Sequence, residues 1–223
     1  MNFKYLDIIT GFFVAVLLIS NIADTKPITI GLLSFGGGTF LFPIAYIFGD
    51  ILTEVYGFKR ARRVIWIGFA CSALMAIVFT LVGMAPPSPD WAYQKDFMNI
   101  LGLTPRITLA SLIAYFFGEF INSVVLAKMK IFTKGKYLWI RTIGSTIVGE
   151  LVDTTIFMFI AFFGVFPLSL IFSIIISGYF LKVITEVMFT PVTYWIVNIL
   201  KKKEHEDYYD TKTKFTPFEI DVK

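Results

Sequence analysis

Residues 48–54 read FGDILTE and place Asp50 and Glu54 inside a long apolar run, and related stretches follow at 117–123 (FGEFINS) and 148–154 (VGELVDT). In each stretch an acid follows a glycine, and a hydroxyl, an amide or a second acid comes three residues later. Residues three apart share one face of a helix. A charge in hydrocarbon costs roughly 3 kcal/mol unless it faces the bundle interior, a partner or water. The repeated pattern therefore predicts a narrow polar stripe on each of three apolar helices.

The composition is typical of a membrane protein. Hydrophobic residues make up 57% of the 223 residues and charged residues only 16%, whereas soluble domains have about 25% charged residues. The single cysteine, Cys71, lies in an apolar run, and the single histidine, His205, lies near the charged C-terminal end. We therefore expect a polytopic membrane protein with no disulfide framework, no metal site and no cofactor.

Six apolar stretches are long enough to cross a bilayer, which takes about 20 helical residues. They are residues 6–22, 39–56, 64–85, 107–127, 143–163 and 168–200. The predicted fold class is all-α. A six-helix transmembrane domain is expected over residues 1–200, followed by a charged cytoplasmic tail over residues 201–223.

Basic residues alternate between the two sides of this arrangement. One side holds Lys4, Lys59, Arg60, Arg62, Arg63, Lys128, Lys130, Lys134, Lys136, Arg141, Lys201, Lys202 and Lys203, and the other holds only Lys26, Lys95 and Arg106. Cytoplasmic loops carry the excess of Lys and Arg, so both termini are predicted to be cytoplasmic. These basic clusters would set the topology and contact anionic membrane lipid. Their distribution argues against a nucleic-acid partner.

Three segments are not expected to form long helices. Residues 25–39 contain Pro27 and the glycine run Gly36–Gly38, which predicts an outer loop or a hairpin that dips into the outer mouth. Residues 86–105 are predicted to form a second outer loop. The tail after Lys203 mixes charged residues, tyrosine and proline without periodicity, so we expect a mobile end.

Charged groups from four stretches reach a similar depth. At about 1.5 Å per residue, Asp50, Glu119 and Lys182 lie roughly 18 to 21 Å from the outer ends of their helices. Their convergence predicts a polar chamber that binds a substrate or an ion. The substrate-binding candidates are Asp50, Glu119, Asn122, Glu150, Asp153 and Lys182, together with Tyr46, Tyr115 and Tyr179, each one turn from one of these charges. Carboxylates beside planar side chains suit a flat ring with adjacent N–H donors, such as the edge of guanine.

A structural role for these charges is the alternative. Lys182 could pair with Asp50 or Glu119 to hold helices together, because an unpaired buried charge is costly. Pairing alone does not account for the acids within the apolar stretches, which are Asp50, Glu119, Glu150, Asp153 and Glu186. Glu54 is expected at the cytoplasmic interface, where it could pair with nearby arginines.

The residue inventory argues against an enzyme. No histidine lies within an apolar stretch, there is no second cysteine, and no glycine pattern for nucleotide binding is present. The sequence FGD at 48–50 lacks the first glycine of the GxGD element of two-aspartate intramembrane proteases. An intramembrane enzyme that uses only carboxylates stays open as a less favoured reading. A channel is disfavoured because the outer halves of the helices are apolar.

An ordered set of motifs gives a more specific indication. It comprises NIADTKPI (21–28), FPIAYIFGDILTEVYGFKRARRVIW (42–66), FGEFINS (117–123), LWIRTIGSTIVGELVDTTIF (138–157) and GYFLKVITEVMFTPVTYWIV (178–197). This set resembles the queuosine precursor transporter family, which is also grouped among vitamin uptake transporters.

The resemblance implies six helices in a bacterial inner membrane and uptake of a small-molecule 7-deazaguanine. The substrates would be 7-cyano-7-deazaguanine and 7-aminomethyl-7-deazaguanine, with the free base queuine imported by some members. Alternatives that stay open are a substrate-capture subunit that needs a partner ATPase, and assembly as a homo-oligomer. Besides the binding candidates, we expect Asn21, Lys26, Glu54, Arg62, Arg141 and Glu186 to support transport.

Overall fold

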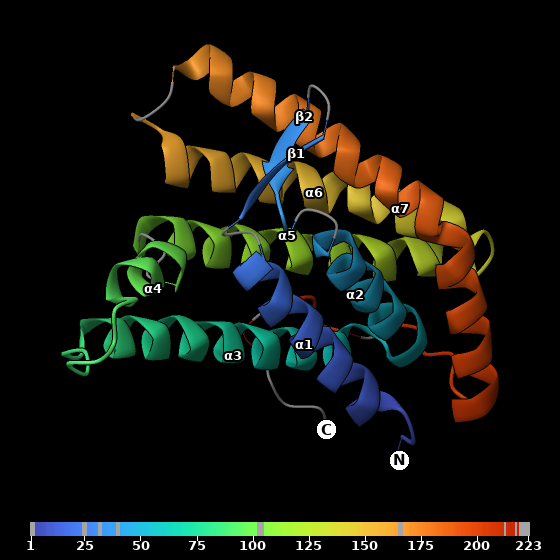
Figure 1. Cartoon of the computed structure of the whole chain (residues 1–223). Coiled ribbons are helices and arrows are strands. Elements are labelled where there is room, and N and C mark those ends of the chain that lie inside the picture. Colours follow the sequence, from blue (N-terminus) through green and yellow to red (C-terminus); the bar gives the residue numbers. More distant parts are fainter. Residues whose placement is uncertain are drawn as a thin grey trace.

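The computed structural model describes residues 3–23, 26–30, 33–38, 41–101, 105–164, 167–211, 213–216 and 218. Seven helices and one hairpin follow along these residues (Figure 1). They are α1 (Leu6–Ala23), β1 (Pro27–Ile30), β2 (Leu33–Gly36), α2 (Phe42–Tyr56), α3 (Phe58–Met84), α4 (Gln94–Leu101), α5 (Pro105–Phe132), α6 (Leu138–Phe162) and α7 (Leu168–Glu204). The helical fold class is confirmed, with a two-stranded antiparallel hairpin in addition.

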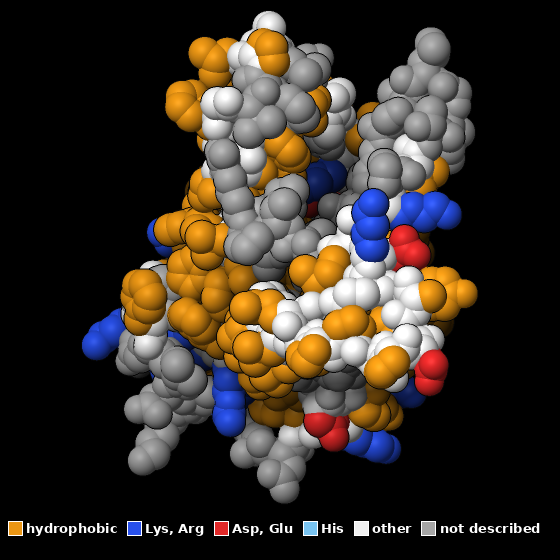
Figure 2. Space-filling model, turned by 60° about the vertical axis from the view of Figure 1, so that its left-hand side comes forward, with side chains coloured by type: hydrophobic (Ala, Val, Ile, Leu, Met, Phe, Trp, Pro, Cys, Tyr) orange, Lys and Arg blue, Asp and Glu red, His pale blue; other side chains and the backbone are white. Residues whose placement is uncertain are grey.

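Five helices are long and apolar enough to cross a membrane: α1, α3, α5, α6 and α7. In Figure 1, α3, α5 and α6 run side by side, and α3 packs against α5, α5 against α6, and α6 against α7. The outer face is apolar: Leu81, Met188 and Trp195, for example, are exposed. Figure 2 shows hydrophobic side chains over much of one such face. Large exposed apolar surfaces of this kind suit contact with lipid.

The predicted span at 39–56 is a 15-residue helix, α2, and is not among these five. At 1.5 Å per residue it is about 22 Å long, which is less than the roughly 30 Å hydrocarbon core. The helix begins only after the glycine run, with Pro43 in its first turn. It ends at Gly57, whose φ of +84° favours glycine.

This short helix lies at the centre of the bundle. Helix α2 contacts α1, α3, α5, α6 and α7, and almost every described side chain from Ala45 to Tyr56 is buried. In a helix that is buried on all sides, each polar side chain needs a hydrogen-bond partner from another helix or from a ligand.

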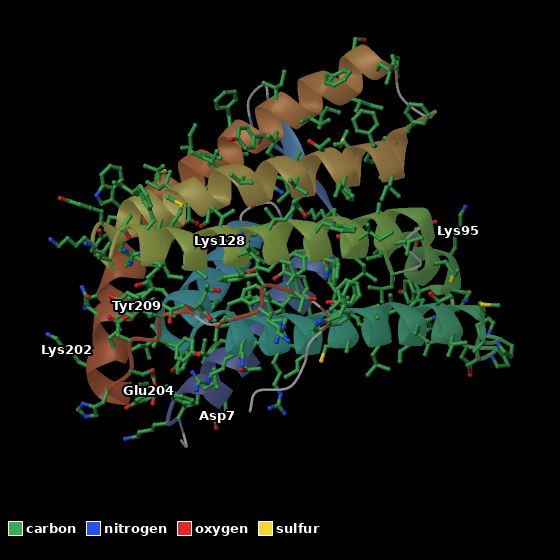
Figure 3. All side chains as sticks on the ribbon, turned by 180° about the vertical axis from the view of Figure 1, so that it is seen from behind. Asp7, Lys95, Lys128, Lys202, Glu204 and Tyr209 are labelled. Carbon is green, nitrogen blue, oxygen red and sulfur yellow. The ribbon has the colours of Figure 1, made fainter. Side chains whose placement is uncertain are left out.

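The start of α1 and the ends of α2 and α7 lie together at one end of the molecule, which we call the basic end. The backbone N–H groups of Lys4 and Tyr5, at the start of α1, donate to Glu204 at the end of α7. The hydroxyl of Tyr56, at the end of α2, donates to the same carboxylate, at 2.9 Å. Figure 3 shows Lys202, Glu204 and Tyr209 at this end and Lys95 at the opposite end. The ends of the helices therefore follow the alternation predicted from the basic residues.

Two features of the loops and tail were not predicted from the sequence. The loop at 86–105 contains the short helix α4, and Gln94 Nε2 donates to the carbonyl of Gly83 at 2.7 Å. The tail beyond Glu204 was expected to be mobile, and this expectation is wrong for the described tail residues. They pack against α2, α3 and α5 through contacts such as Tyr208 N to Val55 O.

Candidate functional site

A set of buried polar side chains lies among α2, α5, α6 and α7. We call it the polar centre: Asp50, Glu119, Asn122, Glu150, Asp153, Lys182 and Glu186. The sequence predicted that these helices would carry polar groups inward. The structure adds which groups contact one another and which have no partner.

Lys182 of α7 forms ion pairs with two acids of α6. Its Nζ lies 2.7 Å from Glu150 Oε2 and 2.7 Å from Asp153 Oδ2, and it contacts Thr154 Oγ1 at 3.4 Å. The pairing of Lys182 with Asp50 or Glu119, considered from the sequence, is therefore not the one observed. Glu150 and Asp153 lie three residues apart on one helix face, which is why one ammonium group reaches both.

This ion-pair cluster is less deeply buried than the rest of the polar centre. The side chains of Lys182 and Asp153 keep about 15% and 14% of their exposure, whereas Glu150 is 1% exposed. Figure 2 shows a hollow with basic and acidic side chains inside it on the face that it presents. The cluster is therefore the part of the polar centre that solvent reaches.

Asp50 of α2 is tied to α5. Asn122 Nδ2 donates to Asp50 Oδ1 at 2.7 Å, and Thr53 Oγ1 donates to Ser123 Oγ at 3.1 Å, one helical turn nearer the basic end. Asp50 Oδ2 and Asn122 Oδ1 are buried and have no hydrogen-bond partner. This α2–α5 contact thus keeps one free acceptor on each of the two side chains.

Glu119 of α5 is an acid of the polar centre with no partner for its carboxylate. Both carboxylate oxygens are buried without a hydrogen-bond partner. The carboxylate lies against the backbone of Gly49, where an added Cβ would overlap Glu119 Oε1. Glycine at position 49 therefore makes the space in which the Glu119 carboxylate sits, directly beside Asp50.

Two of the three predicted tyrosines lie beside Glu119. The rings of Tyr46 and Tyr115 meet edge to face, with centroids 6.1 Å apart, and both hydroxyls are buried without a partner. Tyr179 differs: it is only partly buried, and its ring contact is with the neighbouring Phe180. The structure thus brings Tyr46 and Tyr115 to the polar centre, and records no contact between Tyr179 and it among the described residues.

Glycines bring the helices of the polar centre close together. An added Cβ at Gly118 would lie 2.5 Å from the Tyr46 hydroxyl and 2.7 Å from Asp153 Cβ, and one at Gly149 would lie 2.8 Å from Asn122 Cβ. Gly49, Gly118 and Gly149 thus permit close packing of these helices. Small residues serve this purpose between membrane helices.

Three of the residues expected to support transport lie away from the basic end. Asn21 lines a small cavity of about 10 Å³ with Ser72 and Tyr115, which is room for about one water molecule. Lys26 is exposed, and its backbone joins α1 to the hairpin through bonds to Ala23 and Gly37. Glu186, on α7, is 1% exposed, and neither of its oxygens has a hydrogen-bond partner.

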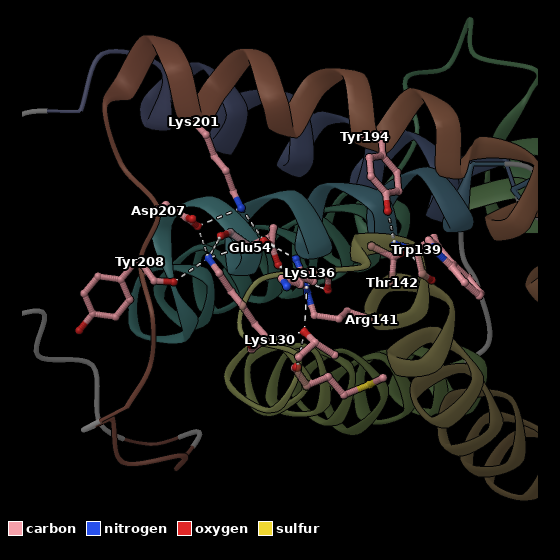
Figure 4. A network of polar contacts seen from close by, with 12 residues as sticks. Glu54, Lys130, Lys136, Trp139, Arg141, Thr142, Tyr194, Lys201, Asp207 and Tyr208 are labelled. Carbon is pink, nitrogen blue, oxygen red and sulfur yellow. Dashed lines mark hydrogen bonds and ion pairs between the residues drawn. The ribbon is translucent and has the colours of Figure 1, made fainter.

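Glu54 forms the second polar cluster, at the basic end (Figure 4). Arg141 of α6 donates to it through Nη2 at 2.7 Å and Nε at 3.2 Å, and Lys201 of α7 through Nζ at 2.6 Å. Lys130 of α5 lies 3.6 Å away and also donates to the Glu54 carbonyl. Glu54 was expected to pair with nearby arginines, and it does pair with Arg141. Its partners come from three other helices and reach it only after folding.

The tail completes this cluster. Asp207 accepts from Lys130 at 2.6 Å and from Lys201 at 2.9 Å. Burial on its own would raise the pKa of Asp207, but the hydrogen bonds from these two lysines outweigh it and hold that pKa below its ordinary value. Lys130 and Lys201 were read from the sequence only as topology signals, and nothing in the sequence pointed to Asp207.

Two further contacts fix the tail on α3. Asp210 Oδ2 accepts from the backbone N–H of Phe58 at 2.9 Å, which satisfies a free donor in the first turn of α3. Arg62, which is buried, donates to the carbonyls of Lys214 and Thr216. Arg62 thus holds the tail, while Arg141 holds Glu54.

The fold and its two polar clusters define a polytopic helical membrane protein with an ion-pair cluster at the basic end and a buried polar centre. A sequence model of the family described as "Putative vitamin uptake transporter" matches residues 36–196. A Bacillus subtilis (strain 168) protein named "Probable queuosine precursor transporter" is 32% identical over 179 residues, which cover 78% of this chain and 77% of the relative. The chain belongs to the queuosine precursor transporter family.

A more distant relative covers more of the chain. The Escherichia coli (strain K12) protein named "Queuosine precursor transporter" is 26% identical over 207 residues, which cover 91% of this chain and 90% of the relative. No solved structure matches this chain. The chain is therefore a multi-pass membrane transporter of this family.

Proposed function

We propose that this protein imports queuosine precursors across the bacterial inner membrane, with both termini in the cytoplasm. The substrates in this proposal are 7-cyano-7-deazaguanine and 7-aminomethyl-7-deazaguanine. The observation that carries it is the buried, unpartnered carboxylate of Glu119, in the same centre as the paired rings of Tyr46 and Tyr115. The names of the relatives support the substrate class.

The proposed topology has six crossings. Five are α1, α3, α5, α6 and α7, and the sixth is α2 together with the hairpin at 27–36. The gathering of Lys130, Arg141 and Lys201 at one end supports a cytoplasmic basic end, because positive residues are retained on that side.

In this proposal Glu119 reads the guanine-like edge of the substrate. That edge offers an N–H and an adjacent NH₂ group, and an ionised carboxylate accepts two parallel hydrogen bonds. Neither oxygen of Glu119 has another partner, so neither bond requires an existing contact to break. Asp50 and Glu150 suit this role less well, because each already holds a partner through Asn122 or Lys182.

The carbonyl oxygen of the substrate needs a donor, and Asn122 fits best. Its amide group has two hydrogens, of which one goes to Asp50. Lys182 has three donor hydrogens and three neighbours: Glu150, Asp153 and Thr154. The sequence left both residues open as the donor, and the contacts favour Asn122.

Transport requires the basic end to open. Glu54, Lys130, Arg141, Lys201 and Asp207 close it with ion pairs that span four helices and the tail. Release of substrate to the cytoplasm would separate these groups, whereas the partly exposed Lys182 cluster marks the approach from the opposite end.

The experiment is uptake by purified protein in liposomes, with 7-cyano-7-deazaguanine as substrate and chemical analysis of what enters. Wild type should take up the unchanged base, Glu119→Gln should not, and Glu206→Gln, a tail acid with the same change, should behave as wild type. Uptake that needs added ATPase subunits would support a substrate-capture subunit. A chemically altered product would support an intramembrane enzyme. No uptake of any precursor under all conditions would contradict the proposal.

A further inference from the structure

The polar centre holds more acids than cations. Lys182, the one lysine of the centre, is already paired with Glu150 and Asp153. Asp50, Glu119 and Glu186 lie in the same centre and are each at most 1% exposed. Full ionisation of all five acids beside one lysine would leave a net charge of −4 in the bundle.

Such a charge is not sustainable in the bundle. An isolated buried carboxylate loses its hydration, and in practice it takes up a proton instead. Asp50 has the amide of Asn122 as a partner, but Glu119 and Glu186 have no hydrogen-bond donor within the described residues. In the sealed centre, some of these acids therefore carry protons.

We propose that Glu186 is the proton-binding residue through which uptake is coupled to a proton gradient. This rests on the proposed import function and adds its driving force. Glu186 is chosen because Glu119 is assigned to the substrate and Asp50 to Asn122, which leaves Glu186 free to exchange a proton. It lies on α7 one turn after Lys182, in the helix that contains Pro191 and changes direction in its second half (Figure 1).

The charged groups that face Glu186 would favour proton binding in the sealed centre. They are Asp50 on α2, Glu119 on α5 and Glu150 on α6. Two like charges in one site disfavour each other. When the basic end opens, water and cations reach the carboxyl group of Glu186. Its ionised form then becomes favourable.

The proton step is a simple acid dissociation. Glu186 binds one proton from the outer side as its carboxylate becomes a carboxylic acid. When the basic end is open to the cytoplasm, the O–H bond of Glu186 breaks. The proton passes to water and the carboxylate remains. One proton enters with each substrate through this residue, and no other reactant is required.

The test uses purified protein in liposomes with 7-cyano-7-deazaguanine, because this base has no amine that would itself carry a proton. An imposed pH difference, acidic outside and with the membrane potential clamped, should drive accumulation above equilibrium in wild type. Glu186→Gln should lose this accumulation and keep exchange of labelled for unlabelled substrate. Glu206→Gln should show both. A pH dye inside wild-type vesicles should report acidification when substrate is added outside, which tests coupling without any variant.

The outcomes separate the two proposals. Exchange without any response to the pH difference, or accumulation driven by a sodium gradient instead, would overturn the proton proposal and leave the import function standing. Gradient-driven accumulation by Glu186→Gln would overturn the role of this residue. Absence of both exchange and accumulation in wild type would contradict the import function itself.

Discussion

Glu54 of α2 accepts two hydrogen bonds from Arg141 of α6, at 2.7 and 3.2 Å, although 87 positions separate the two residues. Both side chains are almost fully buried. The pair joins the central helix to α6 at the basic end, and Lys201 and Asp207 extend it to α7 and the tail. From this contact we predict how strongly single substitutions at the basic end will destabilise the protein.

Glu54→Gln should destabilise the protein strongly. The change removes a buried charge and leaves the buried Arg141 without its counter-charge, and breaking a buried pair in this way typically costs about 3–5 kcal/mol. Thermal unfolding in detergent, followed by size-exclusion chromatography, measures the effect. Arg141→Lys should also destabilise, because lysine cannot make the two-bond contact. Arg63→Lys, at an exposed arginine, is the control and should be neutral. Equal stability of all three would contradict the account of this cluster.

Lys182→Ala should be more damaging than Asp153→Asn. The first change leaves two acids without a cation, whereas the second leaves Lys182 paired with Glu150. Both variants should lose transport. If they reach the membrane at wild-type levels, the loss reports function, and if they fail to accumulate, the cluster is structural. Lys202→Ala, an exposed lysine in the same helix, serves as the control. Normal transport by both variants would contradict a functional polar centre.

Gly118→Ala should prevent normal packing of α2, α5 and α6. The new methyl group would lie 2.5 Å from the Tyr46 hydroxyl and 3.1 Å from the Gly149 carbonyl, which is closer than packed atoms approach. We expect a cost of about 1–3 kcal/mol and a corresponding drop in thermal stability. Gly11→Ala, in α1 with no neighbour within 4 Å, should be neutral or slightly stabilising. The reverse order of the two variants would show that the α5–α6 contact is wrongly described.

Asp207→Asn should loosen the tail at neutral pH. Because the pKa of Asp207 is lowered in the folded protein, its ionised form stabilises the docked tail above pH of about 4 and ceases to do so as the pH falls through that lowered pKa. Asp207 is 44% exposed, so the effect should be small, a factor of about 2 to 5 in amide hydrogen exchange over residues 205–216. Glu206→Gln should not change it. A difference between wild type and Asp207→Asn that grows in acid would contradict this assignment.

The sequence predicted the helical bundle well because membrane spans are long and their apolar signal is strong. The five long helices begin and end within a few residues of the predicted stretches, except that α3 begins at Phe58 and so includes buried Arg62. Helix α2 also falls within the predicted stretch at 39–56, but its 15 residues are too few for it to count among the five membrane-length helices.

The polar residues could be listed from the sequence, but their partners could not. The three-residue spacing predicted that Glu150 and Asp153 share a helix face. Their ion pairs with Lys182, however, depend on how α6 packs against α7. The tail gave no signal, because Asp207 and Asp210 acquire their roles only when folding brings them to Lys130 and Phe58. Long-range contacts of this kind leave no periodic trace in a sequence.

The most direct test of the central claim is binding of 7-cyano-7-deazaguanine to the purified protein, with wild type, Glu119→Gln and Glu206→Gln compared. Glutamine presents an NH₂ group to an edge that consists of donors, so Glu119→Gln should weaken binding by roughly 5- to 150-fold, the equivalent of 1–3 kcal/mol for a two-bond base contact. Glu206→Gln should bind as wild type does. An adenine-like or 2-deamino analogue should compete poorly, because it leaves the buried carboxylate of Glu119 unpaired. Unchanged affinity of Glu119→Gln, or equal competition by adenine, would contradict the assignment of Glu119 to the guanine-like edge.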